Sequence, residues 1–313
     1  KFPVEEITGS CFCCRFTSLT QAAEKLSNDQ PPEIFLAEPV GSCTDLTATV
    51  SYPLRRMYGD AYQIAPYSVL VDPLRAERIL GLVPGKTFSE KVIYIYRKQL
   101  EEAEILVINK LDSLDEARFQ RLRSALESRF PRGKVLGISA RHGTNLDTWI
   151  DLLTANILGN DPTMDVDYDT YAEGEALLGW VNLTAVVKSP SEFPGNQFLN
   201  TLINTIQSRL EAEAVEIAHL KMTLSPDEGT DLAVINLVRG DGQPEFSHEL
   251  QEPLSVGELI LNLRAEADPQ RLEAEVQQAL RQTADLFQLQ TDIGHSEAFR
   301  PGRPVPTHRL AEA

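Results

Sequence analysis

Four short runs of apolar residues divide the first half of this chain of 313 residues. Runs that are apolar throughout are typical of strands covered on both faces of a sheet. Amphipathic stretches follow the last two runs, and strands that alternate with helices through short loops predict a parallel sheet wrapped by helices. The four predicted strands are IFLA at 34–37, SVLV at 68–71, ILVI at 105–108 and VLGI at 135–138.

Two helices of this half are predicted from their apolar stripes. The first stripe repeats at spacings of three and four and consists of Phe119, Leu122, Leu126 and Phe130. The second helix is predicted over 145–158, with an inward face made of Leu146, Trp149, Ile150 and Leu153. The N-terminal domain is therefore predicted to be α/β and to span residues 1–159.

The composition changes at residue 160. Segment 160–175 is acidic, contains Pro and Gly and shows neither period, so it is predicted to be an interdomain linker. Beyond it we expect a smaller α+β domain over 176–295, with a split β-α-β arrangement, and an extended tail rich in Pro and Arg over 296–313. The strands of this domain are expected near 177–187, 217–224, 231–239, 257–265 and 287–293, and its helices near 195–213 and 269–286. The first of these helices has an apolar face formed by Phe198, Leu202, Ile203, Ile206 and Leu210.

Net charge and cysteine content limit which partners and which cellular location are expected. The net charge is −17, so the surface repels phosphate backbones and anionic lipid, and neither nucleic acid nor a membrane is an expected partner. No apolar run approaches the ~20 residues of a spanning helix, and no signal peptide is visible. Bridges within the sequence CFCC would be strained, so reduced thiols and a cytoplasmic location are predicted.

The stretch GSCFCCRF, residues 9–16, places three of the four cysteines in four positions. Thiolates are soft ligands, and a short loop that carries three of them suits Zn²⁺, Cu(I) or Co(II). A helix is predicted to begin near Thr17 or Ser18. Its positive end and Arg15 are expected to lower the pKa values of the thiols.

Cys11, Cys13 and Cys14 are therefore the predicted metal ligands, in an open and exchangeable site. Three thiolates do not close a tetrahedral structural site. The fourth ligand stays open among Glu5, Glu6, Cys43, water and a partner protein. A redox-sensing or merely tolerated thiol cluster is the alternative interpretation of the same residues.

A second motif, NKLD at 109–112, directly follows an apolar strand, where ligands bind in α/β proteins. Guanine presents two adjacent N–H donors that adenine lacks, and the carboxylate of Asp112 can accept both. The stem of Lys110 can cover the base, and the amide of Asn109 can tie neighbouring loops together. The next strand ends in Ser139 and Ala140, whose backbone N–H groups are predicted to meet the guanine oxygen.

The sequence EPVG follows the first apolar run. A carboxylate and a glycine at a strand end, here Glu38 and Gly41, can address a magnesium-bound water and a γ-phosphate. GLVPGKT at 81–87 looks like a phosphate loop but has three residues between its glycines where that motif needs four. It also follows a predicted short helix, so we do not assign it to phosphate binding.

These motifs together resemble the CobW/HypB/UreG group of metal-chaperone GTPases, and the CobW-like branch most of all. The resemblance covers residues 3–160 by motif and the second domain by architecture. It implies a P-loop NTPase-like fold and hydrolysis of GTP with Mg²⁺. It also implies a transition metal, with Zn²⁺ before Co²⁺, that passes to a client enzyme or cofactor-synthesis protein. By this match the three cysteines bind the metal, Glu38 is the switch acid and NKLD recognises guanine. A homodimer is a further expectation.

One departure from the family concerns the phosphate loop, which in the family lies before the cysteines. The chain begins at Lys1, too late to include that loop or the first strand, so truncation and an inactive hydrolase are expected. Two other functions stay open. One is a nucleotide-independent metal-binding module with a decayed GTPase half. The other is a redox sensor that forms a reversible disulfide with Cys43.

Overall fold

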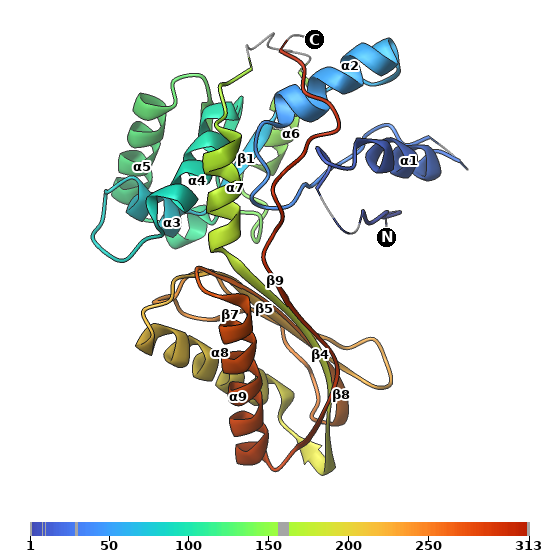
Figure 1. The fold of residues 1–313 in the computed structure, drawn as a ribbon, viewed down its shortest axis with the longest axis vertical. Coiled ribbons are helices and arrows are strands. Elements are labelled where there is room, and N and C mark those ends of the chain that lie inside the picture. Colours follow the sequence, from blue (N-terminus) through green and yellow to red (C-terminus); the bar gives the residue numbers. More distant parts are fainter. Residues whose placement is uncertain (1, 8, 10, 29–30, 156–162, 312–313) are drawn as a thin grey trace. The chain divides into compact units, whose positions relative to one another are not determined.

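The structure is a computed structural model that describes residues 2–7, 9, 11–28, 31–155 and 163–311 (Figure 1). The chain forms two compact units, each described here by itself. Unit 1 consists of Lys1–Gly85, Ser89–Ala172 and Pro304–Ala313. Unit 2 consists of Lys86–Phe88 and Glu173–Arg303. The end of the chain therefore belongs to the same unit as its beginning.

Unit 1 contains a parallel sheet in the order β1-β2-β3. Its strands are β1 (Ser68–Val71), β2 (Ile105–Ile108) and β3 (Lys134–Gly137). Every residue of the central strand β2 is buried, as its unbroken apolar run predicts. The predicted α/β class is confirmed, with β3 beginning one residue earlier than expected.

The predicted strand at 34–37 is wrong. Residues 31–40 have no regular structure, and the side chains of Ile34 and Leu36 are 60% and 88% exposed. The segment pairs with neither β1 nor β3 among the described residues. An extended segment without a neighbour gains no ladder hydrogen bonds, so its apolar composition alone does not make it a strand.

Several α-helices accompany the parallel strands in the part of the chain up to Leu177. They are α1 (Phe16–Leu26), α2 (Tyr52–Tyr58), α3 (Pro73–Ile79), α4 (Glu90–Glu102), α5 (Glu116–Arg129), α6 (Leu146–Thr154) and α7 (Tyr168–Leu177). The stripe of α5 is confirmed, since Leu122 and Leu126 are fully buried. In α6 the expected inward residue Ile150 is 45% exposed, and Leu152 packs inward in its place. Residues 156–158 of that predicted helix lie outside the described residues.

The segment predicted as a linker differs from the structure in its second half. Residues 160–162 lie outside the described part of the chain, but Tyr168 begins helix α7. The carboxylate of Asp167 accepts hydrogen bonds from the backbone N–H groups of Asp169 and Thr170, which caps the helix start. Tyr171 is buried against apolar neighbours. The cap at Asp167 and the burial of the Tyr171 ring therefore stabilise a helix in spite of the acidic composition of this segment.

Unit 2 is built on an antiparallel sheet in the order β7-β6-β5-β8-β4-β9. Its strands are β4 (Gly179–Phe193), β5 (Ile217–Pro226), β6 (Ala233–Leu237), β7 (Glu245–His248), β8 (Leu254–Ala265) and β9 (Gln290–Phe299). β4 and β5 are joined by α8 (Gly195–Ala212) and both lie antiparallel to β8 between them. This is the predicted split β-α-β arrangement. Figure 1 shows α8 and α9 (Pro269–Phe287) on the same face of the sheet.

The apolar face predicted for α8 is confirmed, because all five of its residues are fully buried. Strand β7 was not predicted. The tail predicted to begin at 296 starts inside β9, because the ladder with β4 continues to the pair Trp180 and Phe299. Among the described residues, no helix has the length and apolar character needed to cross a bilayer.

Candidate metal and nucleotide site

The thiol loop, residues 11–14, is a tight turn directly before α1. The carbonyl of Cys11 accepts hydrogen bonds from the N–H groups of Cys14, at 3.2 Å, and Arg15, at 3.0 Å. The helix then begins at Phe16, whose side chain is 1% exposed and anchors the turn. This single turn therefore brings the three cysteines, which are near one another in the sequence, close together in space.

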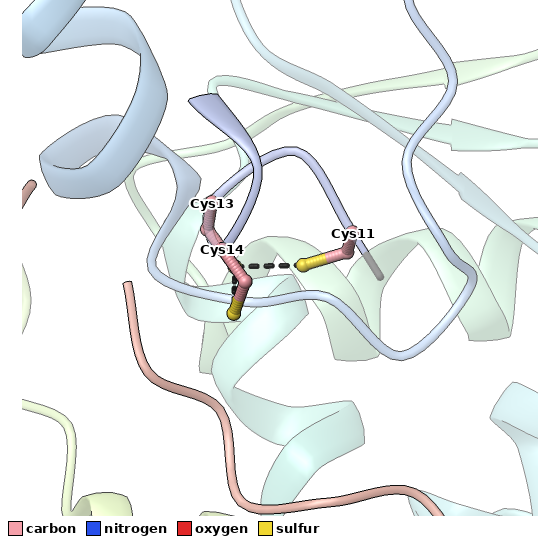
Figure 2. A group of neighbouring side chains, drawn as sticks. All are labelled: Cys11, Cys13 and Cys14. Carbon is pink, nitrogen blue, oxygen red and sulfur yellow. Dashed lines mark hydrogen bonds between the residues drawn. The ribbon is translucent and has the colours of Figure 1, made fainter. Parts of the chain in front are cut away.

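The three thiols lie close enough to share one ion. Their sulfur atoms lie within 4.8 Å of one another (Figure 2). The sulfur of Cys13 lies 2.7 Å from that of Cys11 and 3.6 Å from that of Cys14. Thiolates that bind one tetrahedral Zn²⁺ at ~2.3 Å are about 3.8 Å apart. The pair Cys13–Cys14 already fits this spacing, and Cys11 needs to move away from Cys13 by roughly 1 Å.

The protonation of the cluster is uneven. Hydrogen bonds from the thiols of Cys13 and Cys43 lower the pKa of Cys11 to about 3. The hydrogen bond with Cys11 raises the pKa of Cys13, which is 2% exposed. The neighbouring thiols are thus the largest cause of the lowered pKa at Cys11, and backbone hydrogen bonds of Cys14 and Cys13 lower it further. The expected lowering is therefore found at Cys11, whereas the pKa of Cys13 shifts in the opposite direction.

Of the candidates for a fourth ligand, Cys43 comes near the cluster and Glu5 is otherwise engaged. Cys43 is 3% exposed, and its thiol hydrogen-bonds to both Cys11 and Cys13. Glu5 forms an ion pair with Lys25 at 3.2 Å. Cys43 therefore adds a thiol to the edge of the three-cysteine group.

The loops predicted to recognise guanine lie side by side at the carboxyl ends of β2 and β3. The amide oxygen of Asn109 accepts a hydrogen bond from the N–H of Ala140 at 3.0 Å. The hydroxyl of Ser139 donates to the carboxylate of Asp112. The N–H of Leu111 also donates to the carbonyl of Ile138, at 2.9 Å. The structure thus brings together residues from two loops about thirty positions apart in the chain, as predicted.

Asp112 is available to a ligand in its ionised form. Its side chain is 32% exposed. The hydrogen bond from Ser139 lowers the pKa of the Asp112 carboxyl below its usual range, because it stabilises the charged form. The imidazole Nε2 of His142 lies 3.9 Å from the second carboxylate oxygen. His142 is a neighbour that the motif alone did not indicate.

Lys110 has an environment that the sequence did not predict. Its backbone is left-handed, with φ of 57°, and its ammonium pairs with Asp72 at 3.1 Å. Asp72 directly follows β1, so the rule that polar groups gather at the carboxyl ends of parallel strands would have found it. The salt bridge holds the lysine stem along the edge of the sheet where a base would lie.

Glu38 is exposed on the irregular segment 31–40, so the expectation that it lies at the end of a strand is wrong. A few residues later, the side-chain amide of Gln99 donates to the carbonyls of Gly41 and Cys43, each at 2.9 Å. Gln99 lies on α4 and was not predicted, because a single glutamine on an amphipathic helix carries no sequence signal. It joins the predicted phosphate-sensing loop to the residue that reaches the thiols. GLVPGKT follows α3 rather than a strand, as expected.

One family of known proteins matches the first part of the chain. A family model described as CobW/HypB/UreG, nucleotide-binding domain, matches residues 2–136, the segment that holds the thiol loop and NKLD. Residues 2–136 of this chain are therefore similar to the nucleotide-binding domain of the CobW/HypB/UreG family.

The chain is also similar to two crystal structures, the Zn(II)-bound YjiA GTPase from E. coli and a Zn(II)-bound triple mutant of the YjiA GTPase. In each case the identity is 12%, the match covers 75% of this chain and 68% of that chain, and the TM-score is 0.24. A superposition at this score does not place individual residues on one another. No curated protein matches the sequence significantly.

Proposed function

We propose that this protein is a GTP-dependent metallochaperone that binds a transition metal at Cys11, Cys13 and Cys14 and delivers it to a client enzyme or cofactor-synthesis protein. The observation that carries the proposal is the convergence of three cysteine sulfurs within 4.8 Å, in a chain whose residues 2–136 match the model of a nucleotide-binding domain. Zn²⁺ is the first candidate cargo and Co²⁺ the second, since both accept tetrahedral thiolate ligands.

The arrangement of the thiols favours transfer over permanent storage. Cys11 and Cys14 are only half-buried, so a ligand from a client can approach the metal beside them. Three protein thiolates leave one tetrahedral position for water, Cys43 or the incoming ligand. The metal can then exchange its protein ligands for those of the client one at a time, so it is never released without ligands.

Guanine recognition is assigned to Asp112, with Asn109 and Lys110 around the base and the Ser139–Ala140 loop beside it. The ionised carboxylate accepts the two N–H groups of guanine, which adenine cannot offer. Glu38 and Gly41 are assigned to the γ-phosphate and the water bound to Mg²⁺. All of these roles follow from the resemblance of the motifs, and the contact between the two base loops supports the guanine-binding roles.

Gln99 provides a physical route between nucleotide and metal. Its amide holds the carbonyls of Gly41 and Cys43, so ordering of the loop at Gly41 by a γ-phosphate also orders Cys43 beside the other thiols. A thiol cluster that is ordered in advance loses less entropy on binding metal. GTP and metal are therefore expected to bind cooperatively, and hydrolysis to favour release.

Cobalt(II) titration tests the proposal, because thiolate ligation produces a charge-transfer absorption. In a full-length protein we expect Co²⁺ to bind about 5–150-fold more tightly with a non-hydrolysable GTP analogue than with GDP. The double substitution Cys13→Ser and Cys14→Ser should abolish the thiolate band. Unchanged affinity in that variant would remove the thiol loop from the metal site.

The same titration separates the alternatives. Metal binding with equal affinity in both nucleotide states would favour a nucleotide-independent metal-binding module. A protein that binds no Co²⁺ but forms a reversible disulfide with Cys43, detected by mass spectrometry, would favour a redox sensor. Cys43→Ser distinguishes a fourth ligand from a bystander, because only a ligand changes the cobalt spectrum.

A further inference from the structure

The last residues of the chain lie against the thiol loop within unit 1. The backbone N–H of Thr307 donates to the carbonyl of Cys13 at 2.8 Å, and its hydroxyl donates to the carbonyl of Cys14 at 3.1 Å. The ring of His308 packs edge-on against Phe16, with 5.1 Å between the ring centroids. Thr307, which lies 293 positions after Cys14 in the chain, thus holds the carbonyl groups of both Cys13 and Cys14.

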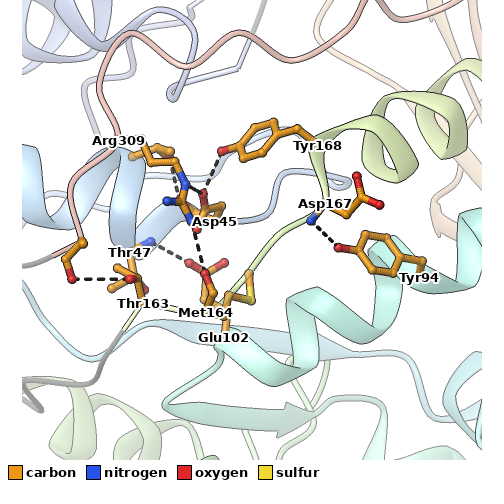
Figure 3. Close-up of polar contacts among 11 residues, drawn as sticks. Asp45, Thr47, Tyr94, Glu102, Thr163, Met164, Asp167, Tyr168 and Arg309 are labelled. Atoms are coloured by element: carbon orange, nitrogen blue, oxygen red, sulfur yellow. Dashed lines mark hydrogen bonds and ion pairs between the residues drawn. The ribbon is translucent and has the colours of Figure 1, made fainter.

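Two residues further on, Arg309 binds a buried acid. Its Nε lies 2.7 Å from the carboxylate of Asp45, whose side chain is 1% exposed, and the hydroxyl of Tyr168 donates to the same oxygen at 2.7 Å (Figure 3). The guanidinium also donates to the carbonyl of Met164 at 3.2 Å. A buried carboxylate that loses its partner is costly, so this contact is a specific anchor rather than a surface ion pair.

Thr307 and Arg309 contact two different loops beside the cysteine group. Thr307 binds the loop that carries Cys13 and Cys14. Arg309 binds Asp45, two residues after Cys43. The N–H of Leu310 extends the second contact by donating to the carbonyl of Ala48 at 2.9 Å. The segment therefore spans from the thiol loop to the loop that brings in the fourth thiol.

We propose that residues 304–311, the C-terminal strap, set the spacing between these two loops, with Thr307 and Arg309 as positioning residues for the metal site. The inference rests on the metal binding proposed above, but its geometric part concerns the thiols alone. Holding both loops before metal arrives reduces the ordering cost of bringing four sulfur atoms together. The strap thus makes the affinity of the N-terminal thiols depend on the C-terminus.

The test compares full-length Arg309→Ala with Arg123→Ala. Arg123 forms an exposed ion pair with Glu127 at 2.7 Å on α5, so the control removes the same side chain and charge away from the thiols. We expect Arg309→Ala to weaken Co²⁺ binding about tenfold, within the usual range for coupled sites, and Arg123→Ala to leave it unchanged. Arg309→Lys should recover part of the affinity, because it restores the positive charge beside Asp45.

A second measurement does not depend on metal. In the metal-free protein, a thiol-reactive disulfide reagent should modify the buried Cys13 and Cys43 faster in Arg309→Ala than in the wild type or the control. Thr307→Val, which removes one donor without changing side-chain size, should give a smaller increase. It also serves as the milder variant in case Arg309→Ala does not fold.

The outcomes separate the strap from the proposed function. Faster modification of Cys13 and Cys43 with no thiolate band in the wild type would support the strap and overturn metal binding. A wild-type thiolate band with equal affinities and equal modification rates in Arg309→Ala, Thr307→Val and Arg123→Ala would overturn the strap and leave metal binding intact. A fall in melting temperature alone, without either change, would show a merely structural role and would also overturn it.

Discussion

Among the described residues, unit 1 has its buried apolar side chains in separate clusters, whereas most of those in unit 2 belong to one large core. In unit 1, Leu106, Leu122 and Leu126 form one cluster on one side of the short sheet, and Val107 and Ile138 belong to another. In unit 2 both helices and the strands contribute to a single cluster. The strands of the parallel sheet in unit 1 are only four residues long.

The buried polar groups follow the same division. Most of those that the structure describes lie in unit 1, among them Asp45, Glu77, Glu102 and Ser139. Polar burial is costly unless each group has a partner, and it is concentrated where chemistry takes place. Unit 2 therefore has the larger apolar core, while unit 1 contains most of the buried polar groups, including ones that could bind ligands. Three substitutions test this contrast.

The largest effect is expected in the core of unit 2. Leu202 is fully buried on α8, and Leu202→Ala should cost about 2–5 kcal/mol because it leaves a cavity in a continuous core. The chain has 2 tryptophans, Trp149 in unit 1 and Trp180 in unit 2, so a Trp149→Phe background reports on unit 2 by fluorescence during urea unfolding.

The matched control is Leu286→Ala, because this leucine lies on α9 of the same unit but is 70% exposed. It should change the free energy of unfolding by less than about 0.5 kcal/mol. Equal losses at both positions would contradict the single core that distinguishes unit 2 from unit 1.

The second prediction concerns pH and unit 1. Burial raises the pKa of Glu102 from 4.5 to about 7, although its carboxylate accepts a 2.6 Å hydrogen bond from the N–H of Thr47. The folded state therefore binds a proton more tightly than the unfolded state. The resulting stability is fully present below about pH 4.5 and is lost as pH rises through about 7, by roughly 3 kcal/mol.

Glu102→Gln stays neutral at every pH, and its amide oxygen can still accept from Thr47. We expect this variant to be more stable than the wild type by up to about 3 kcal/mol above pH 7, with the difference vanishing towards pH 4.5. Unfolding followed through Trp149 in a Trp180→Phe background measures unit 1. The same substitution at the exposed Glu127 is the control, and an identical pH profile in all three proteins would contradict the prediction.

The smallest effect is expected at the guanine loop, where the change affects ligand binding rather than stability. Asp112→Asn should weaken GTP by about 1.5 kcal/mol, roughly tenfold, because the amide offers a donor where guanine also presents one. Xanthosine triphosphate, which has an acceptor at that position, should bind the variant better than GTP does. Isothermal titration of a full-length protein measures both affinities.

Asp115→Asn is the control for this prediction. Asp115 caps α5 by accepting a hydrogen bond from the N–H of Arg118 at 2.8 Å, and asparagine is an equally good cap. It should therefore leave both affinities unchanged. If the Asp112 variant kept its preference for GTP over the xanthine nucleotide, its carboxylate would not be the group that recognises guanine.

The predictions from sequence succeeded where one period dominates. Strand β2 is buried on both faces and α8 buries its whole apolar stripe, so their patterns predict their structures directly. They failed where pairing or capping outweighs pattern. Residues 34–37 have the composition of a strand but no neighbour, and Tyr168–Leu177 has the composition of a linker but is capped by Asp167.

The candidate site shows the same limit. Cys11, Cys13 and Cys14 could be predicted as a group because one turn of chain brings near neighbours together. NKLD and the Ser139–Ala140 loop could be paired because parallel strands end at a common edge. Both inferences use short-range geometry or the regular order of a sheet.

By itself the sequence determined the α/β and α+β architecture of the two halves and singled out the thiols and the carboxylate that are candidates for ligand binding. Only the tertiary structure decided which distant residues surround them. Gln99, Cys43, Thr307 and Arg309 reach these residues through a few hydrogen bonds or ion pairs each, across long stretches of chain. Such contacts have no period and no fixed spacing. They arise because the folded loops leave particular carbonyls and carboxylates within reach, which no local pattern encodes.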